Sequence, residues 1–400
     1  MINPTLFFSV SIVAQFPLEY TKKETAMNPT FTTVFVLILT AMGTLQSQKR
    51  IRDHGLEIGV LRPGPYNAIT DVPGVSVGHT TLIVGENIRT GATALLPHGG
   101  NLFQEKVPAA IHIGNGFGKL AGYSQVKELG NLETPIVLTN TLGVATATNA
   151  LVKYTLGQEG NETVQSVNAV VGETNDGHLN DIRGQHITEA HVLQAIGNAA
   201  AGPVAEGNVG AGTGTVCFGY KGGIGTASRV LPKKAGGYAL GVLVQTNFGG
   251  VLEVNGVAVG KKLGDYSEGF KYGADGSCMI VVMTDAPLDS RNLDRLAKRA
   301  LLGLGKTGGI ASNGSGDYVI AVSTAETGRI YHTANNLVQT SPTLRNEAMT
   351  PLFLAVIEAT EEAILNALFA AETMSGRDGH TIEALPKKQV LQFLKEAGKL

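Results

Sequence analysis

The sequence has no tryptophan, only two cysteines among its 400 residues, and a low share of charged residues, 16%. Cys217 and Cys278 lie in apolar runs and form no CxxC or Cys/His pattern, which excludes a disulfide framework and the usual zinc sites. We expect both thiols to be buried and unreactive, although Cys278 stays a rival nucleophile because it follows Ser277. The formal net charge of −2 gives no overall reason to expect a nucleic-acid partner.

Several catalytic motifs are missing as well. No GxSxG elbow is present to anchor an α/β-hydrolase triad, and His186 and His191 lack the acidic partner of an HExxH site. "GLGKTGG" (303–309) has Ala300 where a P-loop needs its first glycine, so we interpret it as a glycine turn that ends a helix. "GAGTGTVCFGYKGGIG" (210–225) is followed by a strand pattern where a dinucleotide loop needs a helix. We therefore predict neither a metal nor a cofactor.

Glycine is abundant instead, with 52 residues, and 43% of the chain is hydrophobic, enough for a large core. Short β-branched runs predict strands at 109–113, 135–139, 167–172, 215–219, 239–245, 317–323 and 329–332, and a turn followed by a strand within 67–84. Helical patterns between them cover 144–159, 187–200, 289–304 and a final amphipathic segment from Pro386. This mixture predicts a layered α/β sandwich, and no change in composition divides residues 48–400.

The stretch 341–372 predicts a long apolar helix. Ser341 is placed as its cap and Pro342 in its first turn. Three glutamates interrupt the apolar part, so we expect a buried layer helix and no membrane span.

The first 47 residues differ from the rest of the chain. "FTTVFVLILTAMGTLQS" (31–47) is an uncharged apolar stretch followed by small and polar residues, and Lys22 and Lys23 precede it. This order is typical of a secretory signal. Met27 is a plausible start, and a membrane anchor is the lesser alternative. We expect residues 1–47 to be removed and the mature protein, from about Gln48, to be exported to the periplasm of a bacterium.

The loop "YGADGSCMIVVMTDAPL" (272–288) places Gly276-Ser277 directly before a strand pattern. A serine is a poor nucleophile until a base removes its proton. One such base is the serine's own α-amino group, whose ordinary pKa of about 7.7–8.0 lies near working pH. That group exists only if the bond before Ser277 is cut, and Gly276 would tolerate the strain of an attack by Ser277 on the preceding carbonyl.

From about Gly55 to Leu385 the chain resembles the self-processing serine aminopeptidases, the family of L-aminopeptidase/D-amidases and β-peptidyl aminopeptidases. The stretches that carry the resemblance are "NAITDVPGVSVGHTTL" (67–82), "GNGFGKLAG" (114–122), "TNTLGVATA" (139–147), "GETNDGHLNDI" (172–182), "VQTNFG" (244–249), "GSCMIVVMTDAPL" (276–288), "KRALLGLGKTGGIASNGSGDYVIAVST" (298–324) and "LFLAVIEATEEAILNAL" (352–368).

The resemblance implies a four-layer αββα sandwich, similar to N-terminal-nucleophile hydrolases but connected differently. It also implies cleavage into an α chain, 48–276, and a β chain, 277–400, which assemble as oligomers of αβ units, often tetramers. The substrates would be short peptides and amino-acid amides, with a β-, L-α- or D-α-amino acid at the N-terminus. No membrane partner is implied.

The resemblance also assigns roles to single residues. Ser277 would be the nucleophile, Ser315 the serine that hydrogen-bonds it, and Asp317 the acidic group behind Ser315, where β-peptide-cleaving members carry glutamate. Asn247 would stabilise the oxyanion and Glu173 would hold the substrate's ammonium.

Two details bear on the alternatives. Asn175 stands where some D-amidases place a tyrosine, which favours the β-peptidyl branch. Serine at 277 disfavours an N-acetylornithine-type acyltransferase, which uses threonine on a related fold. A non-catalytic exported binding protein that keeps the scaffold remains a third possibility.

Overall fold

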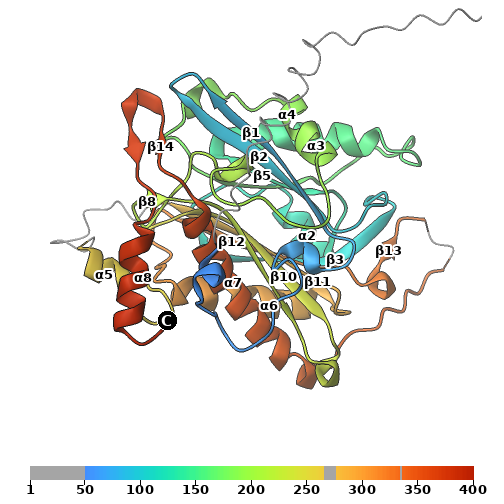
Figure 1. The fold of residues 1–400 in the computed structure, drawn as a ribbon. Helices are drawn as coiled ribbons and strands as arrows, with labels where there is room; N and C mark the ends of the chain where they lie inside the picture. Colours follow the sequence, from blue (N-terminus) through green and yellow to red (C-terminus); the bar gives the residue numbers. More distant parts are fainter. Residues whose placement is uncertain (1–49, 265–275, 334–335) are drawn as a thin grey trace, which may run out of the picture. The chain divides into compact units, whose positions relative to one another are not determined.

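The structure is a computed structural model that describes residues 50–264, 276–333 and 336–400 (Figure 1). The predicted export segment, residues 1–47, lies outside these ranges. The predicted cleavage position, Gly276-Ser277, opens the second range.

Two β-sheets form the centre of the described part. The larger has seven strands in the order β13-β3-β12-β11-β10-β9, with β4 also paired to β3. These strands are β3 (Glu105–Gly116), β4 (Asn131–Leu132), β9 (Gly223–Val230), β10 (Ala239–Asn247), β11 (Ser277–Thr284), β12 (Gly316–Ser323) and β13 (Ile330–Tyr331). The smaller sheet has the order β1-β2-β5-β6. Its strands are β1 (Ser76–Val84), β2 (Ile88–Leu96), β5 (Ile136–Asn140) and β6 (Val170–Thr174).

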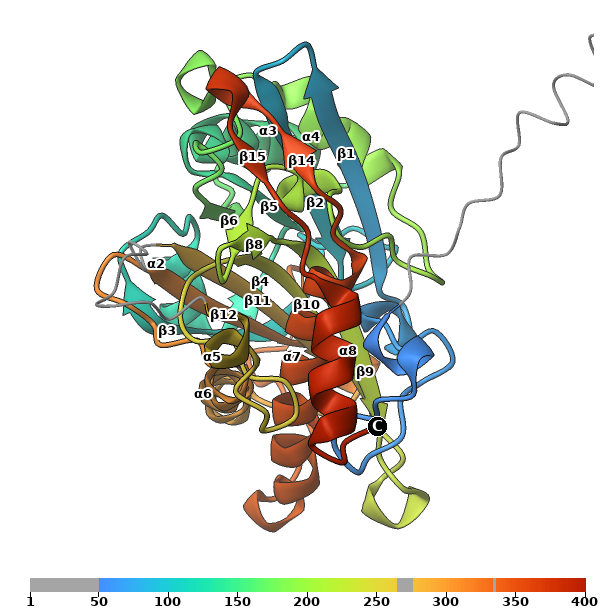
Figure 2. The same ribbon diagram turned by 60° about the vertical axis from the view of Figure 1, so that its left-hand side comes forward.

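Helices cover the outer face of each sheet. The α6 helix (Ser290–Lys306) and the α7 helix (Thr350–Ala370) pack on the larger sheet, and the α3 helix (Val144–Leu156) and the α4 helix (Glu189–Gly197) pack on the smaller one. One apolar cluster fills each helix–sheet interface and a third lies between the sheets. The resulting order of helices, sheet, sheet and helices, visible in Figure 2, confirms the predicted four-layer αββα sandwich.

The central strands of the larger sheet are buried on both faces. Every residue of β10, β11 and β12 is buried. Because successive side chains of a strand point to opposite faces, β11 contributes Cys278, Ile280 and Val282 to the cluster under the helices and Met279 and Val281 to the cluster between the sheets. The unbroken apolar run of β11 is therefore explained by burial of both its faces, one under the helices and the other between the sheets.

Shorter elements surround this frame. They are the α2 helix (Tyr123–Leu129), the α5 helix (Val259–Leu263), the α8 helix (Lys387–Glu396), the hairpin of β7 (Val216–Cys217) with β8 (Tyr220–Lys221), and the hairpin of β14 (Met374–Ser375) with β15 (Thr381–Ile382). The prediction of one strand over 215–219 was wrong in detail. Phe218 and Gly219 adopt φ angles of 54° and 80°, so the chain turns back there, as two-residue hairpin loops do.

The predicted start of the long apolar helix was also wrong. The α7 helix begins at Thr350, with Pro351 in its first turn, and not at Ser341-Pro342. Most of 341–348 is exposed, whereas Met349 is fully buried, so burial begins where the helix begins. Among the described helices, α7 included, none is long and apolar enough to cross a bilayer.

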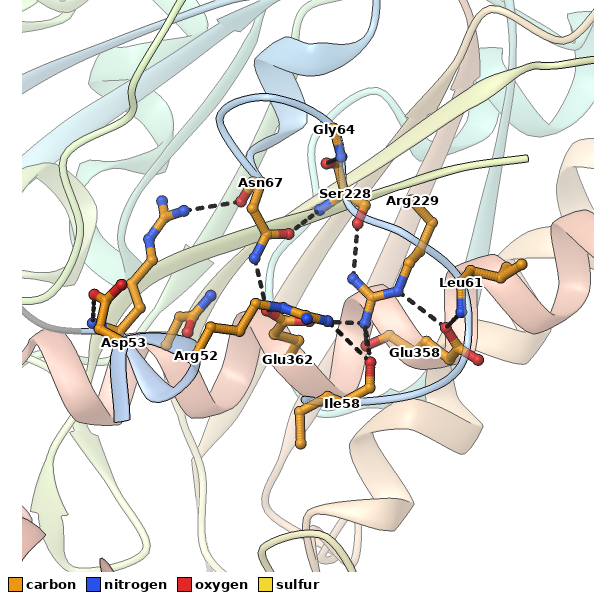
Figure 3. A network of polar contacts seen from close by, with 12 residues as sticks. Arg52, Asp53, Ile58, Leu61, Gly64, Asn67, Ser228, Arg229, Glu358 and Glu362 are labelled. Atoms are coloured by element: carbon orange, nitrogen blue, oxygen red, sulfur yellow. Dashed lines mark hydrogen bonds and ion pairs between the residues drawn. The ribbon is translucent and has the colours of Figure 1, made fainter. Parts of the chain in front are cut away.

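A buried ionic network joins the N-terminal segment to α7 (Figure 3). The Arg229 guanidinium, on β9, lies 3.0 Å from a Glu358 carboxylate oxygen and 2.7 Å from one of Glu362. Arg52 donates a further hydrogen bond of 2.9 Å to Glu362. Arg229 and Glu362 are fully buried. Because a buried charge needs its partner, this network fixes residues 52–67 against α7.

Candidate active site

Three neighbouring strands of the larger sheet meet at one point. β10 ends at Asn247, β11 begins at Ser277 and β12 begins at Gly316. β11 is antiparallel to β10 and parallel to β12, and the register pairs Ser277 with Asn247 on one side and with Gly316 on the other. The sheet therefore places a hydroxyl between a side-chain amide and a backbone amide.

Ser277 lies where these three strands meet, and the residue is 5% exposed. The backbone N–H of Gly316 donates to Ser277 Oγ at 3.2 Å and to the carbonyl oxygen of Gly276 at 3.0 Å. One donor thus contacts both the hydroxyl and the carbonyl of the peptide bond before it. A side chain at Gly276 is impossible without movement, because its Cβ would lie 2.1 Å from the carbonyl oxygen of Asn247.

The side chain of Asn247 is held in one orientation. Its Oδ1 accepts a hydrogen bond of 2.9 Å from the backbone N–H of Val216, in the β7–β8 hairpin. Because the oxygen is occupied, the two N–H donors of the amide are left to face the cavity that Asn247 lines. An amide donor in this position suits a developing negative charge on an oxygen.

Ser315 and Asp317 lie beside Ser277 but are not in hydrogen-bond contact with it. Both are 1% exposed, and within the described ranges Ser315 Oγ and both Asp317 carboxylate oxygens have no partner in ordinary hydrogen-bond geometry. Asp317 is paired with Cys278, so its side chain lies on the helix-covered face of the sheet, whereas Ser277 faces the other way. Asp317 therefore does not face Ser277 directly.

Burial determines the charge state of Asp317. Removal from water raises the pKa of its carboxyl to about 6, and the nearby Ser315 hydroxyl and Cys278 amide lower that pKa in part. The influence of Ser315 reflects its proximity, since the two groups do not meet in the geometry of a formed hydrogen bond. A small approach of Ser315 would let its hydroxyl donate to one Asp317 oxygen, which would satisfy two of these three buried polar atoms.

Glu173 comes from the other sheet, near the end of β6, and is 3% exposed. Its Oε1 accepts the backbone N–H of Lys119 at 2.9 Å, and its Oε2 accepts the hydroxyl of Thr141. A carboxylate has about four acceptor positions. Two neutral donors therefore leave it able to bind a cation from the cavity.

A single cavity of about 610 Å³ brings Glu173, Asn247, Gly276 and Ser277 together. Ser315 and Asp317 do not line it. Its volume is within the range of small-molecule sites, and its lining combines apolar side chains, such as Phe117 and Phe248, with several polar ones. Four predicted residues, Glu173, Asn247, Gly276 and Ser277, thus line the cavity. Ser315 and Asp317 are instead buried at the start of β12.

The two thiols are poor candidates for the nucleophile. Both are fully buried. Burial raises the pKa of Cys217 to about 12 and that of Cys278 well above its ordinary value. Since the thiolate is the reactive form, neither competes with Ser277 near neutral pH.

Other cavity residues were not predicted individually. Phe117 and Lys119 come from the "GNGFGKLAG" stretch and Thr141 from "TNTLGVATA", two stretches that carried the family resemblance. His178 lies in a third such stretch, "GETNDGHLNDI", whereas Ile382 had no sequence signal. Ile382 reaches the cavity only because the β14–β15 hairpin folds back over residues 178–179, where the His178 and His380 rings stack with centroids 4.6 Å apart.

Comparison with known proteins supports this arrangement. The profile described as Peptidase family S58 matches residues 67–382. Beta-peptidyl aminopeptidase BapA of Sphingosinicella microcystinivorans is 42% identical over 374 residues, which are 88% of this chain and 93% of that protein. The protein of the same name from Sphingosinicella xenopeptidilytica is 37% identical over 385 residues, 91% and 95% of the two chains.

Solved structures agree. A Burkholderia sp. beta-aminopeptidase superposes with a TM-score of 0.81 at 42% identity, over 88% of this chain and 99% of that one. The L-aminopeptidase D-Ala-esterase/amidase of Ochrobactrum anthropi, described as a variant of the Ntn hydrolase fold, gives 0.81 at 38% identity with the same coverage. The PH0078 protein of Pyrococcus horikoshii OT3 gives 0.82 at 45%, over 88% and 100%.

The fold and these similarities define a hydrolase of the aminopeptidase class. The chain belongs to peptidase family S58, which confirms the resemblance to serine aminopeptidases.

Proposed function

We propose that the chain cuts its own Gly276–Ser277 bond and that Ser277 then hydrolyses N-terminal residues from short peptides and amides. The observation that carries this proposal is the position of the Gly316 N–H, which bonds both Ser277 Oγ and the Gly276 carbonyl oxygen. A donor aimed at that oxygen stabilises the negative charge it gains when the hydroxyl attacks its carbon.

Self-cleavage would proceed in two steps. Ser277 Oγ attacks the Gly276 carbonyl carbon, the C–N bond breaks, and the nitrogen takes the hydroxyl proton, which leaves an ester and a free amine. Water then hydrolyses the ester, giving a Gly276 carboxylate and restoring the Ser277 hydroxyl. Neither of these two steps uses a metal or a cofactor. The new amine remains beside the Ser277 hydroxyl at the start of β11.

Peptide hydrolysis would reuse the same groups. The Ser277 amine, when neutral, accepts the hydroxyl proton as the oxygen attacks the substrate carbonyl, and the proton passes to the leaving amine, which leaves the first residue as an ester on Ser277 Oγ. Water then attacks that ester with the same amine as base, which releases the amino acid and restores the Ser277 hydroxyl. Asn247 and Gly316 supply two donors for the oxyanion. Glu173 binds the substrate's ammonium, so only peptides with a free N-terminus place their first carbonyl over Ser277.

The substrate class that we favour is a β-amino acid at the N-terminus. Asn175 lines the cavity, and the two Sphingosinicella relatives are named beta-peptidyl aminopeptidases. L- and D-α-amino acids are the alternatives, since the Ochrobactrum relative is named for L- and D-substrates. Export to the periplasm and assembly into tetramers of αβ units are further parts of this proposal.

The direct test is denaturing electrophoresis of the purified chain together with hydrolysis of matched β-alanyl, L-alanyl and D-alanyl amides. We expect two bands, the smaller with the N-terminal sequence SCMIVV, and the highest kcat/KM for the β-alanyl amide. An active protein that runs as one uncut chain would refute self-cleavage. A cut protein that hydrolyses none of the three amides would refute the substrate assignment.

The pH profile should report Asp317. Burial raises its pKa to about 6, so the carboxylate that can hold Ser315 is lost as the pH falls through that value. The Ser277 amine, with an ordinary pKa of about 7.7–8.0, is protonated earlier. We therefore expect log(kcat/KM) to fall with a slope of about one between these values and about two below the lower one. In the Asp317→Asn variant the slope should stay near one over the whole acidic range, and kcat/KM should be lower than in the wild type. A slope of one in the wild type down to pH ~5 would show that the carboxylate is not required.

A further inference from the structure

Lys221, the last residue of β8, is fully buried and takes no part in the reaction described above. Its ammonium donates to the carbonyl oxygens of Gly212 at 3.0 Å and Gly222 at 2.8 Å. The ion pairs of the described residues do not include it. Asp176 and the Cys217 thiol are the acidic groups near enough to favour its charged form.

Stability does not explain this side chain. Taking an ammonium out of water without a carboxylate partner destabilises the folded state, and burial accordingly lowers the pKa of Lys221 to about 7. An apolar side chain of similar length, such as methionine, would avoid that cost. The two carbonyl contacts must therefore serve something other than the core.

The carbonyls that Lys221 contacts belong to the base of the β7–β8 hairpin. Gly212 precedes the hairpin and Gly222 follows it, and the Gly222 N–H also donates to the Thr215 carbonyl at 3.0 Å. Within the hairpin Lys221 is paired with Val216. Val216 is the residue whose N–H holds Asn247 Oδ1 at 2.9 Å.

We propose that Lys221 is a positioning residue of the aminopeptidase reaction, because its ammonium ties the two sides of the hairpin base and so holds the Val216 amide against Asn247. The inference rests on the proposed function, in which Asn247 donates to the oxyanion. A looser hairpin lets the Asn247 amide turn away from the substrate carbonyl. Since the oxyanion exists only in the transition state, the loss falls on kcat and not on KM.

The test is Lys221→Met in the full chain, with Lys106→Met as the matched control. Lys106 is a half-buried lysine of β3 that pairs with Glu133 at 3.3 Å and does not line the cavity. After electrophoresis has shown that both proteins are cut, we expect roughly a tenfold lower kcat for Lys221→Met, because small misplacements of catalytic groups cost that much or more. Its KM should stay within about twofold of the wild type, its Tm should be equal or higher, and Lys106→Met should keep the wild-type kcat.

A double-mutant cycle separates positioning from general damage. If Lys221 acts through Asn247, Lys221→Met should change kcat by less than about twofold in an Asn247→Ala background. Equal effects in both backgrounds, or a rise in KM with kcat unchanged, would overturn the proposal. If Lys221→Met does not fold, Lys221→Gln, which keeps a polar NH₂ donor group but no charge, takes its place in the cycle. Failure of both to fold would show a structural role and also overturn it. An inactive wild type would refute the proposed function itself. That outcome differs from failure of the Lys221 proposal, in which the wild type is active but the cycle shows no coupling between Lys221 and Asn247.

Discussion

Replacement of Ser277 by alanine is expected to leave one uncut chain without aminopeptidase activity. The variant lacks the hydroxyl that the Gly316 N–H contacts, which is the group proposed to attack the Gly276 carbonyl. Without the cut, the free amine that would act as base never forms. Loss of a nucleophile and its base together typically lowers kcat by about 10⁶-fold, so the remaining activity should be undetectable.

The measurement is denaturing electrophoresis and amide hydrolysis on the same preparation, with thermal unfolding to show that the variant is folded. Cys278→Ala is the neighbouring control, and it should be cut and active because its thiol faces the helix-covered core. Ser277→Cys should still be cut, since the thiol occupies the same position. Two bands from Ser277→Ala would mean that another group performs the cleavage and would remove the basis of the proposed mechanism.

The second large effect is expected from Glu173→Gln, which keeps the size of the side chain and removes its charge. The neutral amide cannot compensate a substrate ammonium in a buried site, and breaking one such charge pair costs about 3–5 kcal/mol. We therefore expect kcat/KM for a β-alanyl amide to fall by roughly 10²- to 5 × 10³-fold. The variant should still be cut into two chains, because self-cleavage binds no free ammonium.

Two comparisons make this prediction specific. Glu133→Gln removes another buried carboxylate, which contacts Lys106 and Asn168 and lies outside the main cavity, and should leave kcat/KM near the wild-type value. The ratio of kcat/KM for a substrate with a free N-terminus to that for its N-acetylated form should fall in Glu173→Gln. It should not change in Glu133→Gln. A variant that is uncut, or that keeps the full preference for a free N-terminus, would contradict the role assigned to Glu173.

Much of the frame follows from local sequence. The apolar run after Ser277 predicted a strand, and β11 (Ser277–Thr284) is that strand. The glycine turn predicted at 303–309 is present, since α6 ends at Lys306 and Gly308 has a φ of +88°. These features depend on neighbouring residues alone, which is why they could be read from the chain.

Other features depend on contacts that are distant in sequence. Pro342 and Pro351 both suit a first helical turn, and only the burial of Met349 decides between them. The side of the sheet on which Asp317 lies follows from its pairing with Cys278. The contribution of Ile382 to the cavity follows from a hairpin that folds back from the far end of the chain. The residue types of the site were therefore predictable, but the direction of each side chain was not.

The ionic network on α7 has a consequence for the two products of cleavage. Arg52 and Arg229 precede position 277, whereas Glu358 and Glu362 follow it, so opposite charges of one cluster would belong to different polypeptides. The backbone pairing of β10 with β11 also spans the cut. Parting the fragments would leave two carboxylates and two guanidinium groups without their partners and expose a sheet edge. Neither fragment would therefore contain all the partners of its buried charges and strands. We expect the two fragments to remain an obligate heterodimer that dilution alone does not dissociate.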